Sequence, residues 1–312
     1  MAMLLAAVLA VAPIATRAAE PEATSDTPLF DYASTQSVVT QPFNEPLRKQ
    51  IASFEAEMAR HPPPSDNECV HTLGASRFAR QYDDLGSAQA NAGDYTGAIA
   101  SFEKALACTP RDPELHAELA VELMHVGRLA DARAAVQRGM ALVENATGSG
   151  SLDSILMQLD FIDERWADTV ARLRVMIATQ TDDERAAYYQ CFLWLAQRRA
   201  GVRQPELVTR TEYEEWPAPL LSLMKHATRE AEVLDAVKAE KNERRRREVL
   251  VEALYYVGQL RLANGETDTA RRYFAAAVNL KVLYFIEHQM ALAELNKMRD
   301  RSAGLPNAAL ER

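Results

Sequence analysis

The stretch Tyr82–Pro110 reads YDDLGSAQANAGDYTGAIASFEKALACTP, and it decides the fold of this 312-residue chain. Its pattern returns 34 residues later, because similar residues coincide when the chain is aligned with itself. The matched pairs are Leu85/Leu119, Gly93/Gly127, Ala98/Ala132 and Phe102/Val136. Self-similarity at a fixed period of this length is typical of proteins built from stacked supersecondary units.

The period and the recurring residues resemble the tetratricopeptide repeat (TPR), a helix–turn–helix unit. Residues 79–112 carry the aromatic, Leu-Gly, small-residue and closing-proline positions of that pattern, at Tyr82, Leu85, Gly86, Ala98, Phe102, Ala105 and Pro110. Small residues let helix A and helix B of a unit approach closely, while a large residue fills the groove between units. The resemblance implies an all-α, right-handed TPR solenoid.

Other units are less regular, and they set the predicted domain organisation. Clear repeats are expected at 79–112, 113–146 and 251–283 within a solenoid domain at 47–300. Residues 152–179 form a degenerate helical pair, 182–199 are apolar nearly all round and predict a buried helix, and 285–298 predict a capping helix. A helix at Leu47–Arg60 precedes the repeats, and residues 301–312 form a tail.

The N-terminus predicts export. Residues 1–14 form an apolar run too short to span a bilayer, and the small residues at Thr16 and Ala18 suit cleavage of a signal peptide at 1–18. No Lys or Arg precedes the run, which leaves two alternatives open: a start site upstream, or a buried N-terminal helix. Residues 19–46 lack period and are rich in Pro, Ser and Thr, so we expect a flexible leader and a periplasmic protein.

Composition excludes several classes of protein. The net charge of −9 lacks the electrostatic footprint of a nucleic-acid binder. Neither a phosphate-binding glycine loop, a G-x-S-x-G elbow nor an H-E-x-x-H helix occurs in the sequence, so we expect no enzyme and no cofactor. Lys241–Glu248 reads KNERRRRE, and its interleaved acids favour a solvated helix with internal ion pairs over an anion-binding patch.

The C-terminal third is similar to one branch of the TPR proteins, the NlpI-like envelope adaptor lipoproteins of bacteria. The resemblance covers residues 186–295 and is most specific at Phe285–His288, followed by Ala291 and Leu292. It implies a periplasm-facing scaffold, typically a homodimer, that brings peptidoglycan endopeptidases together with a tail-specific processing protease. No cysteine stands at the acylation position that those lipoproteins carry, so we expect no lipid anchor.

Repeat register predicts which side chains form a partner-binding concave face, because helix A of each TPR unit lines it. These residues are Arg80, Asp83, Ser87, Asn91, Glu114, Ala117, Val121, Met124, His125, Glu252, Tyr255, Gln259 and Leu262. Asp83 and Ser87 stand where some TPR proteins place basic and amide residues that grip a carboxylate, which disfavours that mode. The mixed groove suits a helix or an extended segment. A merely solvated face, or one closed by dimerisation, is the alternative.

Three cysteines leave at least one unpaired. Cys69 lies just before the first helix A and Cys108 ends the following helix B, so the two are candidates for a disulfide, with two free thiols as the alternative. Cys191 is predicted to lie in the core. Cys69 and His71 lack a second Cys/His pair at ligand spacing, so we expect no metal.

Three functions remain open, of which the third, an unrecognised enzyme, has no motif to support it. The first is an adaptor that binds envelope proteins, in particular peptidoglycan hydrolases and a tail-specific protease. The second is a structural TPR module of another envelope assembly, such as a secretion or polysaccharide-export machine.

Overall fold

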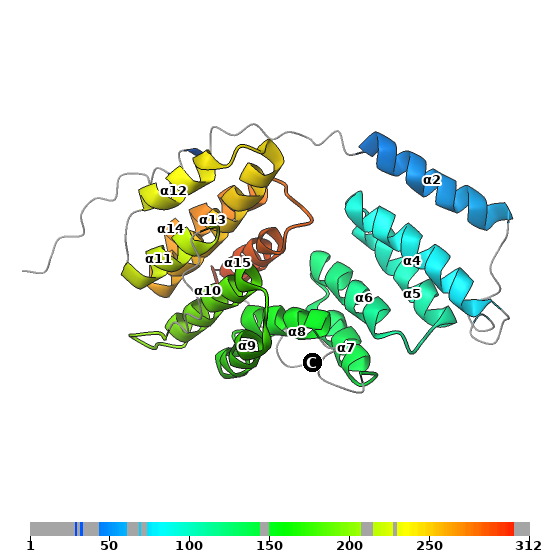
Figure 1. Ribbon diagram of the computed structural model, residues 1–312, viewed down its shortest axis with the longest axis horizontal. Helices are drawn as coiled ribbons and strands as arrows, with labels where there is room; N and C mark the ends of the chain where they lie inside the picture. The colour runs from blue at the N-terminus through cyan, green and yellow to red at the C-terminus, as the bar shows by residue number, and fades with distance from the viewer. Residues whose placement is uncertain are drawn as a thin grey trace, which may run out of the picture.

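The computed structural model describes residues 29, 32–33, 44–60, 69, 74–143, 150–206, 215–226 and 230–302. Within these ranges every regular element is a helix, and the helices follow one another around an arch (Figure 1). The all-α TPR solenoid is therefore confirmed. The predicted signal peptide lies outside the described residues, as do most of the predicted leader and tail.

Helices pair along the chain as the repeat pattern predicts. The arch begins with α2 (Asn44–Arg60), which packs on α4. Three helix A/helix B pairs follow: α4 (Ala75–Asn91) with α5 (Tyr95–Cys108), α6 (Pro113–His125) with α7 (Leu129–Met140), and α8 (Gly150–Ile162) with α9 (Trp166–Thr179). The C-terminal half contains α10 (Asp183–Arg199), α11 (Ala218–His226), α12 (Glu230–Ala239), the pair α13 (Glu243–Ala263) and α14 (Thr267–Asn279), and α15 (Ile286–Ser302).

Polar side chains fix where several helices begin. Asp94 accepts a hydrogen bond from the backbone N–H of Gly97 at the start of α5, and Asp112 accepts one from that of Glu114 at the start of α6. Asn242 caps α13 in the same way. Such caps satisfy backbone donors that the first helical turn leaves unpaired, and they set the repeat boundaries.

Close approach of helix A and helix B explains the recurring Gly and Phe positions. A Cβ added to Gly86 would lie 2.8 Å from the Phe102 ring, and a Cβ added to Gly258 would lie 2.7 Å from the Phe274 ring. Real Cβ atoms do not approach other atoms so closely, so both positions require glycine. The same contact thus occurs in the first repeat and in the last.

The turn between helix A and helix B requires a left-handed backbone. Gly93 and Gly265 take φ values of 80° and 85° in two of these turns. In the degenerate unit, Glu164 occupies the corresponding place with φ 60°, although a left-handed conformation is unfavourable for a residue with a side chain. Trp166 then begins α9 as Tyr95 begins α5, as the sequence predicts.

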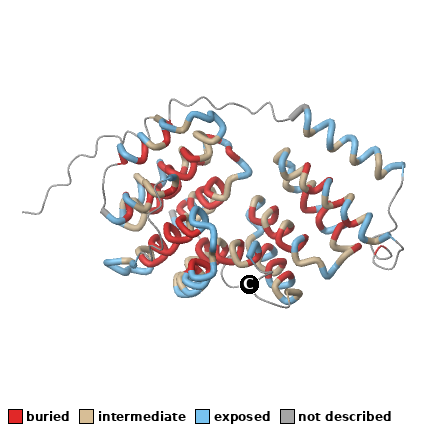
Figure 2. The backbone as a smooth tube through the Cα atoms, viewed as in Figure 1, coloured by how far each residue is buried: buried red, intermediate tan, exposed pale blue. Residues whose placement is uncertain are grey.

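The core is continuous through the arch and widest in the C-terminal half, as Figure 2 shows. Helix α10 is buried from Ala186 to Gln197 except at Tyr188, which confirms the predicted buried helix. The predicted leader is partly ordered, because Leu29 and Ala33 are buried and the Lys238 ammonium lies 5.3 Å from the centre of the Tyr32 ring. No helix in the described part of the chain is long and apolar enough to cross a membrane.

Candidate partner-binding face

The structure divides the predicted concave face into an accessible part and a buried part. On α4 and α6, Arg80, Asn91 and Glu114 are exposed, while Asp83, Ser87, Val121 and His125 are half-buried. We call the surface made by these seven residues, together with Glu118 and Glu122, the α4–α6 face. Ala117 and Met124 were predicted to belong to it, but both are buried in the stripe of α6 that contacts neighbouring helices.

Carboxylates concentrate on the α4–α6 face. Asp83 on α4 and Glu118 on α6 are joined by a side-chain hydrogen bond, which places a proton between them. Burial, followed by the neighbouring charge of Asp83, raises the pKa of Glu118 to about 7. Glu114 and Glu122 lie one helical turn to either side of Glu118 and add to the repulsion. Glu118 and Glu122 were not among the predicted face residues, although they follow Glu114 at successive intervals of four residues.

The α4–α6 face ends at a corner formed with the C-terminal half. The rings of His125 and Tyr95 stack with centroids 4.3 Å apart, and Nδ1 of His125 lies 2.9 Å from a carboxylate oxygen of Glu122. Across the corner, burial lowers the pKa of His288 on α15, and the nearby His125 adds to that lowering. A Cβ added to Gly93 would lie 3.5 Å from Leu283, so the α4–α5 turn meets the α14–α15 loop.

The predicted face of the last repeat is closed, which corrects the prediction for α13. Tyr255 and Gln259 have no exposed surface, and Glu252 is 1% exposed. The reason is that α15 packs on α13: the Tyr255 hydroxyl lies 3.6 Å from Sδ of Met290. Leu262, near the end of α13, stays half-buried. A partner therefore has no access to most of this face.

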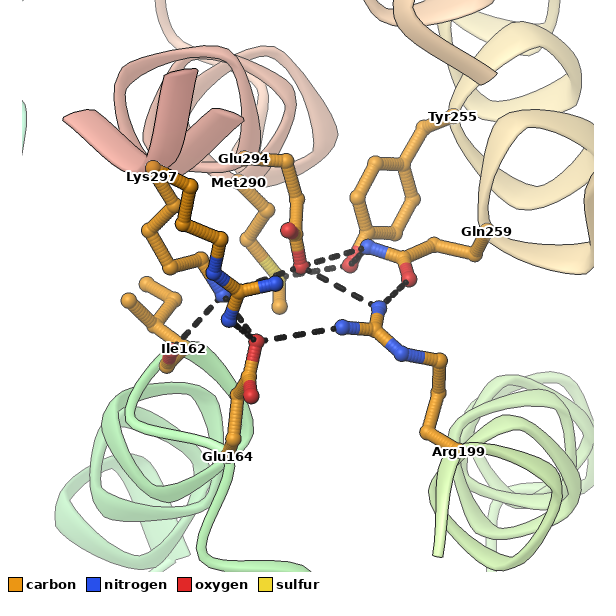
Figure 3. A network of polar contacts seen from close by, with 9 residues as sticks. Ile162, Glu164, Arg199, Tyr255, Gln259, Met290, Glu294 and Lys297 are labelled. Atoms are coloured by element: carbon orange, nitrogen blue, oxygen red, sulfur yellow. Dashed lines mark hydrogen bonds and ion pairs between the residues drawn. The ribbon is translucent and has the colours of Figure 1, made fainter. Parts of the chain in front are cut away.

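A charged network holds α15 in that position (Figure 3). Arg199 of α10 donates hydrogen bonds to Gln259, Glu294 and Glu164 at 2.6, 3.4 and 3.2 Å. Lys297 of α15 donates to the carbonyl oxygen of Ile162 at 2.9 Å, and Arg301 to Glu164 at 2.6 Å. The network thus joins the α8–α9 turn to α10, α13 and α15.

A second buried group of polar residues joins α13 to its other neighbours. Glu252 accepts hydrogen bonds from the Tyr188 hydroxyl at 2.5 Å and from the indole N–H of Trp216 at 2.6 Å. Burial raises the pKa of Glu252 to about 7, and burial followed by the charge of Glu252 raises the pKa of Glu287 to about 8. Cys191 is completely buried nearby, and burial raises the pKa of its thiol.

The two candidate cysteines are bonded in the structure. Cys69 and Cys108 form a disulfide, and both residues are buried. The bond ties the segment between α2 and α4 to the end of α5. Among the described residues, no group of three His, Cys, Asp or Glu side chains is arranged to hold a metal ion.

The basic run of α13 is occupied by contacts within the chain. Arg244 pairs with Glu248 at 3.1 Å and lies over the Tyr284 ring, and Arg245 pairs with Glu184 at 3.5 Å. Arg246 and Arg247 donate to backbone carbonyl oxygens of Glu240 and Leu280. These contacts agree with the expected solvated helix with internal ion pairs.

A groove of about 850 Å³, lined by both charged and apolar side chains, lies beside α8, between α7 and α9. Its charged side chains pair with each other: Asp160, 3% exposed in its side chain, lies 2.7 Å from Arg133 and 3.6 Å from Arg172. Asp153 neutralises Arg172 in turn, at 2.7 Å. The sequence analysis did not anticipate this groove, because its residues come from separate repeats.

Comparison with protein families agrees with the helical pairing. The family model described as Tetratricopeptide repeat matches residues 90–146, from the end of α4 through α7. The protein carries tetratricopeptide repeats. The match includes the Glu118, Glu122 and His125 part of the α4–α6 face, so that part of the face lies within recognised TPR helices. TPR arrays are protein–protein interaction modules, and α4 and α6 present an accessible helix A surface in this array.

Proposed function

We propose that this TPR protein is a periplasmic adaptor that binds other envelope proteins through the α4–α6 face. The observation that carries the proposal is the contrast between its repeats. The helix A face is covered by α15 in the last repeat, whereas that of the first two repeats is open and carries the partly buried Asp83 and Glu118, which have no basic partner in the described chain. A surface that costs folding energy and has no role within the chain is best explained by a partner.

The class of partner comes from the sequence resemblance of residues 186–295 to NlpI-like adaptors. Under that resemblance the partners are a peptidoglycan endopeptidase and a tail-specific processing protease, and the protein itself acts without catalysing a reaction. The signal-peptide pattern at residues 1–18 supports export to the periplasm.

Affinity capture from a periplasmic extract tests the proposal. Wild-type protein should recover an endopeptidase or a tail-specific protease, and the Asp83→Asn/Glu118→Gln variant should recover less of either. Recovery of pilus or export subunits, with neither enzyme present, would contradict the adaptor and favour a structural module. Absence of the protein from the periplasmic fraction would contradict the localisation.

A further inference from the structure

Three of the four carboxyl residues of the α4–α6 face have no basic partner within the described chain. No ion pair joins Asp83, Glu114 or Glu118 to a basic side chain in the described ranges, although Glu122 has His125. Arg80, one turn before Asp83, is exposed to solvent. Burial and mutual repulsion disfavour ionisation of both hydrogen-bonded carboxyls, so a cation placed beside Asp83 and Glu118 would stabilise the fully ionised pair.

The corner at the end of this face supplies a second, independent observation. Nδ1 of His288, a residue only 5% exposed, has no hydrogen-bond partner among the described residues, and neither has the buried hydroxyl of Tyr95. Buried polar atoms are normally paired, so a partner group that displaces the side chains covering these two atoms would satisfy an unmet hydrogen bond.

Apolar side chains lie at the same corner. The large apolar residues that are exposed within the described ranges are Val126, Val175, Val202, Leu283 and Tyr284. Three of these five, Val126, Leu283 and Tyr284, follow His125 or belong to the loop that meets Gly93. An acidic stripe that ends at an apolar patch is complementary to a segment that is basic along its length and apolar at one end.

We propose that the α4–α6 face binds a segment of a partner protein that places a lysine or arginine beside the Asp83–Glu118 pair and an apolar side chain against Val126 and Leu283. This rests on the adaptor function and specifies its partner by chemistry. A second copy of the chain does not fit the site equally well, because the net charge is −9 and the basic run of α13 is engaged by its own acids.

Synthetic peptides test the proposal with purified full-length protein. One probe is a helical peptide with lysines along one face and a terminal leucine, and its matched control has glutamine in place of each lysine. Fluorescence anisotropy should show the lysine peptide binding at least about tenfold more tightly, with the difference shrinking at high salt because exposed charges are screened. Equal affinity for the two peptides would overturn the proposal.

Three variants locate the site. Glu118→Gln should weaken binding of the lysine peptide about tenfold, a loss typical of one charge-assisted contact. Leu283→Ser should weaken binding of both peptides, because both carry the terminal leucine. Glu103→Gln, on the exposed side of α5, is the matched control and should change neither affinity. Equal affinities of the Glu118 and Glu103 variants for the lysine peptide would place its binding elsewhere and overturn the proposal.

Thermal melting separates binding from folding. Glu118→Gln removes a like charge, so its melting temperature near pH 8 should equal or exceed that of wild type; a lower value would mean that the carboxylate has a structural role.

Sedimentation of the wild type tests whether a second copy of the chain occupies the face. Self-association that Glu118→Gln abolishes would identify a second copy as the occupant. If the protein binds the lysine peptide but captures neither enzyme, only the adaptor function is contradicted. If it captures an enzyme but does not bind the peptide, only this inference is contradicted.

Discussion

Single residues at the helix A/helix B contact limit which substitutions this fold tolerates. Gly258 lies against the Phe274 ring inside a helix that is buried on all sides from Val249 to Gln259. An alanine methyl group has no room there, because an interior packed at crystal-like density cannot shift cheaply. The sequence pattern anticipated this position, since the contact of Gly86 with Phe102 repeats it.

We therefore expect Gly258→Ala to lower the free energy of unfolding by about 1–2 kcal/mol, because overpacking outweighs the gain in helix propensity. Urea denaturation followed by circular dichroism measures the change. Gly150→Ala is the control, because no atom lies within 4 Å of its added Cβ and the residue is exposed. Equal destabilisation by both substitutions would show that the Phe274 contact is not the cause.

The buried carboxyls of Glu252 and Glu287 make stability depend on pH. Their pKa values of about 7 and about 8 in the folded chain exceed those of exposed glutamate, so the folded state binds more protons than the unfolded state at neutral pH. Stability from these groups is complete below about pH 4 and is lost as the pH rises towards 8. No periodicity could predict this, because the two residues lie on different helices.

Glu287→Gln should reduce that loss, since a neutral amide has no proton to release. We expect the free energy of unfolding of wild type to fall between about pH 6 and pH 8, and that of the variant to fall less. Urea titrations at several pH values provide the measurement. Parallel pH dependence in the two proteins would exclude Glu287 as a source of the slope.

At the scale of elements, the disulfide links Cys69, which precedes the first repeat, to Cys108 at the end of α5. Cys69 and Cys108 are separated by 39 positions, and the loop that they close makes the unfolded chain less disordered. The sequence allowed the pairing through the return of helix B to the start of helix A, yet it could not give the direction of either Cβ. The distance between the two sulfur atoms depends on the direction of each side chain, and that direction is fixed only when the helices of the repeat are packed together.

The double variant Cys69→Ser/Cys108→Ser should lose about 2–4 kcal/mol of stability, as expected for a closed loop of this length. Chemical denaturation without reductant measures the loss. Dithiothreitol should destabilise wild type by a similar amount and leave the variant unchanged. Peptide mass mapping that found both cysteines as free thiols in the native protein would contradict the bonded structure.

At the scale of the whole molecule, local pattern and long-range packing contribute different parts of the architecture. The 34-residue period predicted the pairs α4–α5, α6–α7 and α13–α14, because each pair is a local unit. It also predicted that Tyr255 and Gln259 would face a partner, which is wrong because α15 covers them. The packing of α15 on α13 depends on charged residues of the α8–α9 turn, α10 and α15 that meet in one network. These residues lie far apart in the sequence, so no local pattern predicts their contacts.

The network around Arg199 should therefore make the C-terminal half the most stable part of the arch. In solenoids, stability is the sum of the repeats and of the interfaces between neighbours, and α15 adds an interface with α8 that skips several neighbours. Hydrogen exchange should accordingly be slowest in α13 and fastest in α2, which packs on α4 alone among the stronger contacts of the described helices.

Arg199→Ala tests the cause of this difference. Its side chain is 8% exposed, and its loss leaves the amide oxygen of Gln259 without its donor and removes one of the two cations that pair with the buried Glu294, so we expect a loss of about 3 kcal/mol. Exchange should accelerate in α13 and α15 and stay unchanged in α4 and α5, because the N-terminal repeats share no contact with the network. Arg271→Ala is the control, since its pair with Asp268 is exposed and contributes less than about 1 kcal/mol. Uniform acceleration in all helices would show instead that the arch unfolds as one cooperative unit, in which the network stabilises every repeat equally.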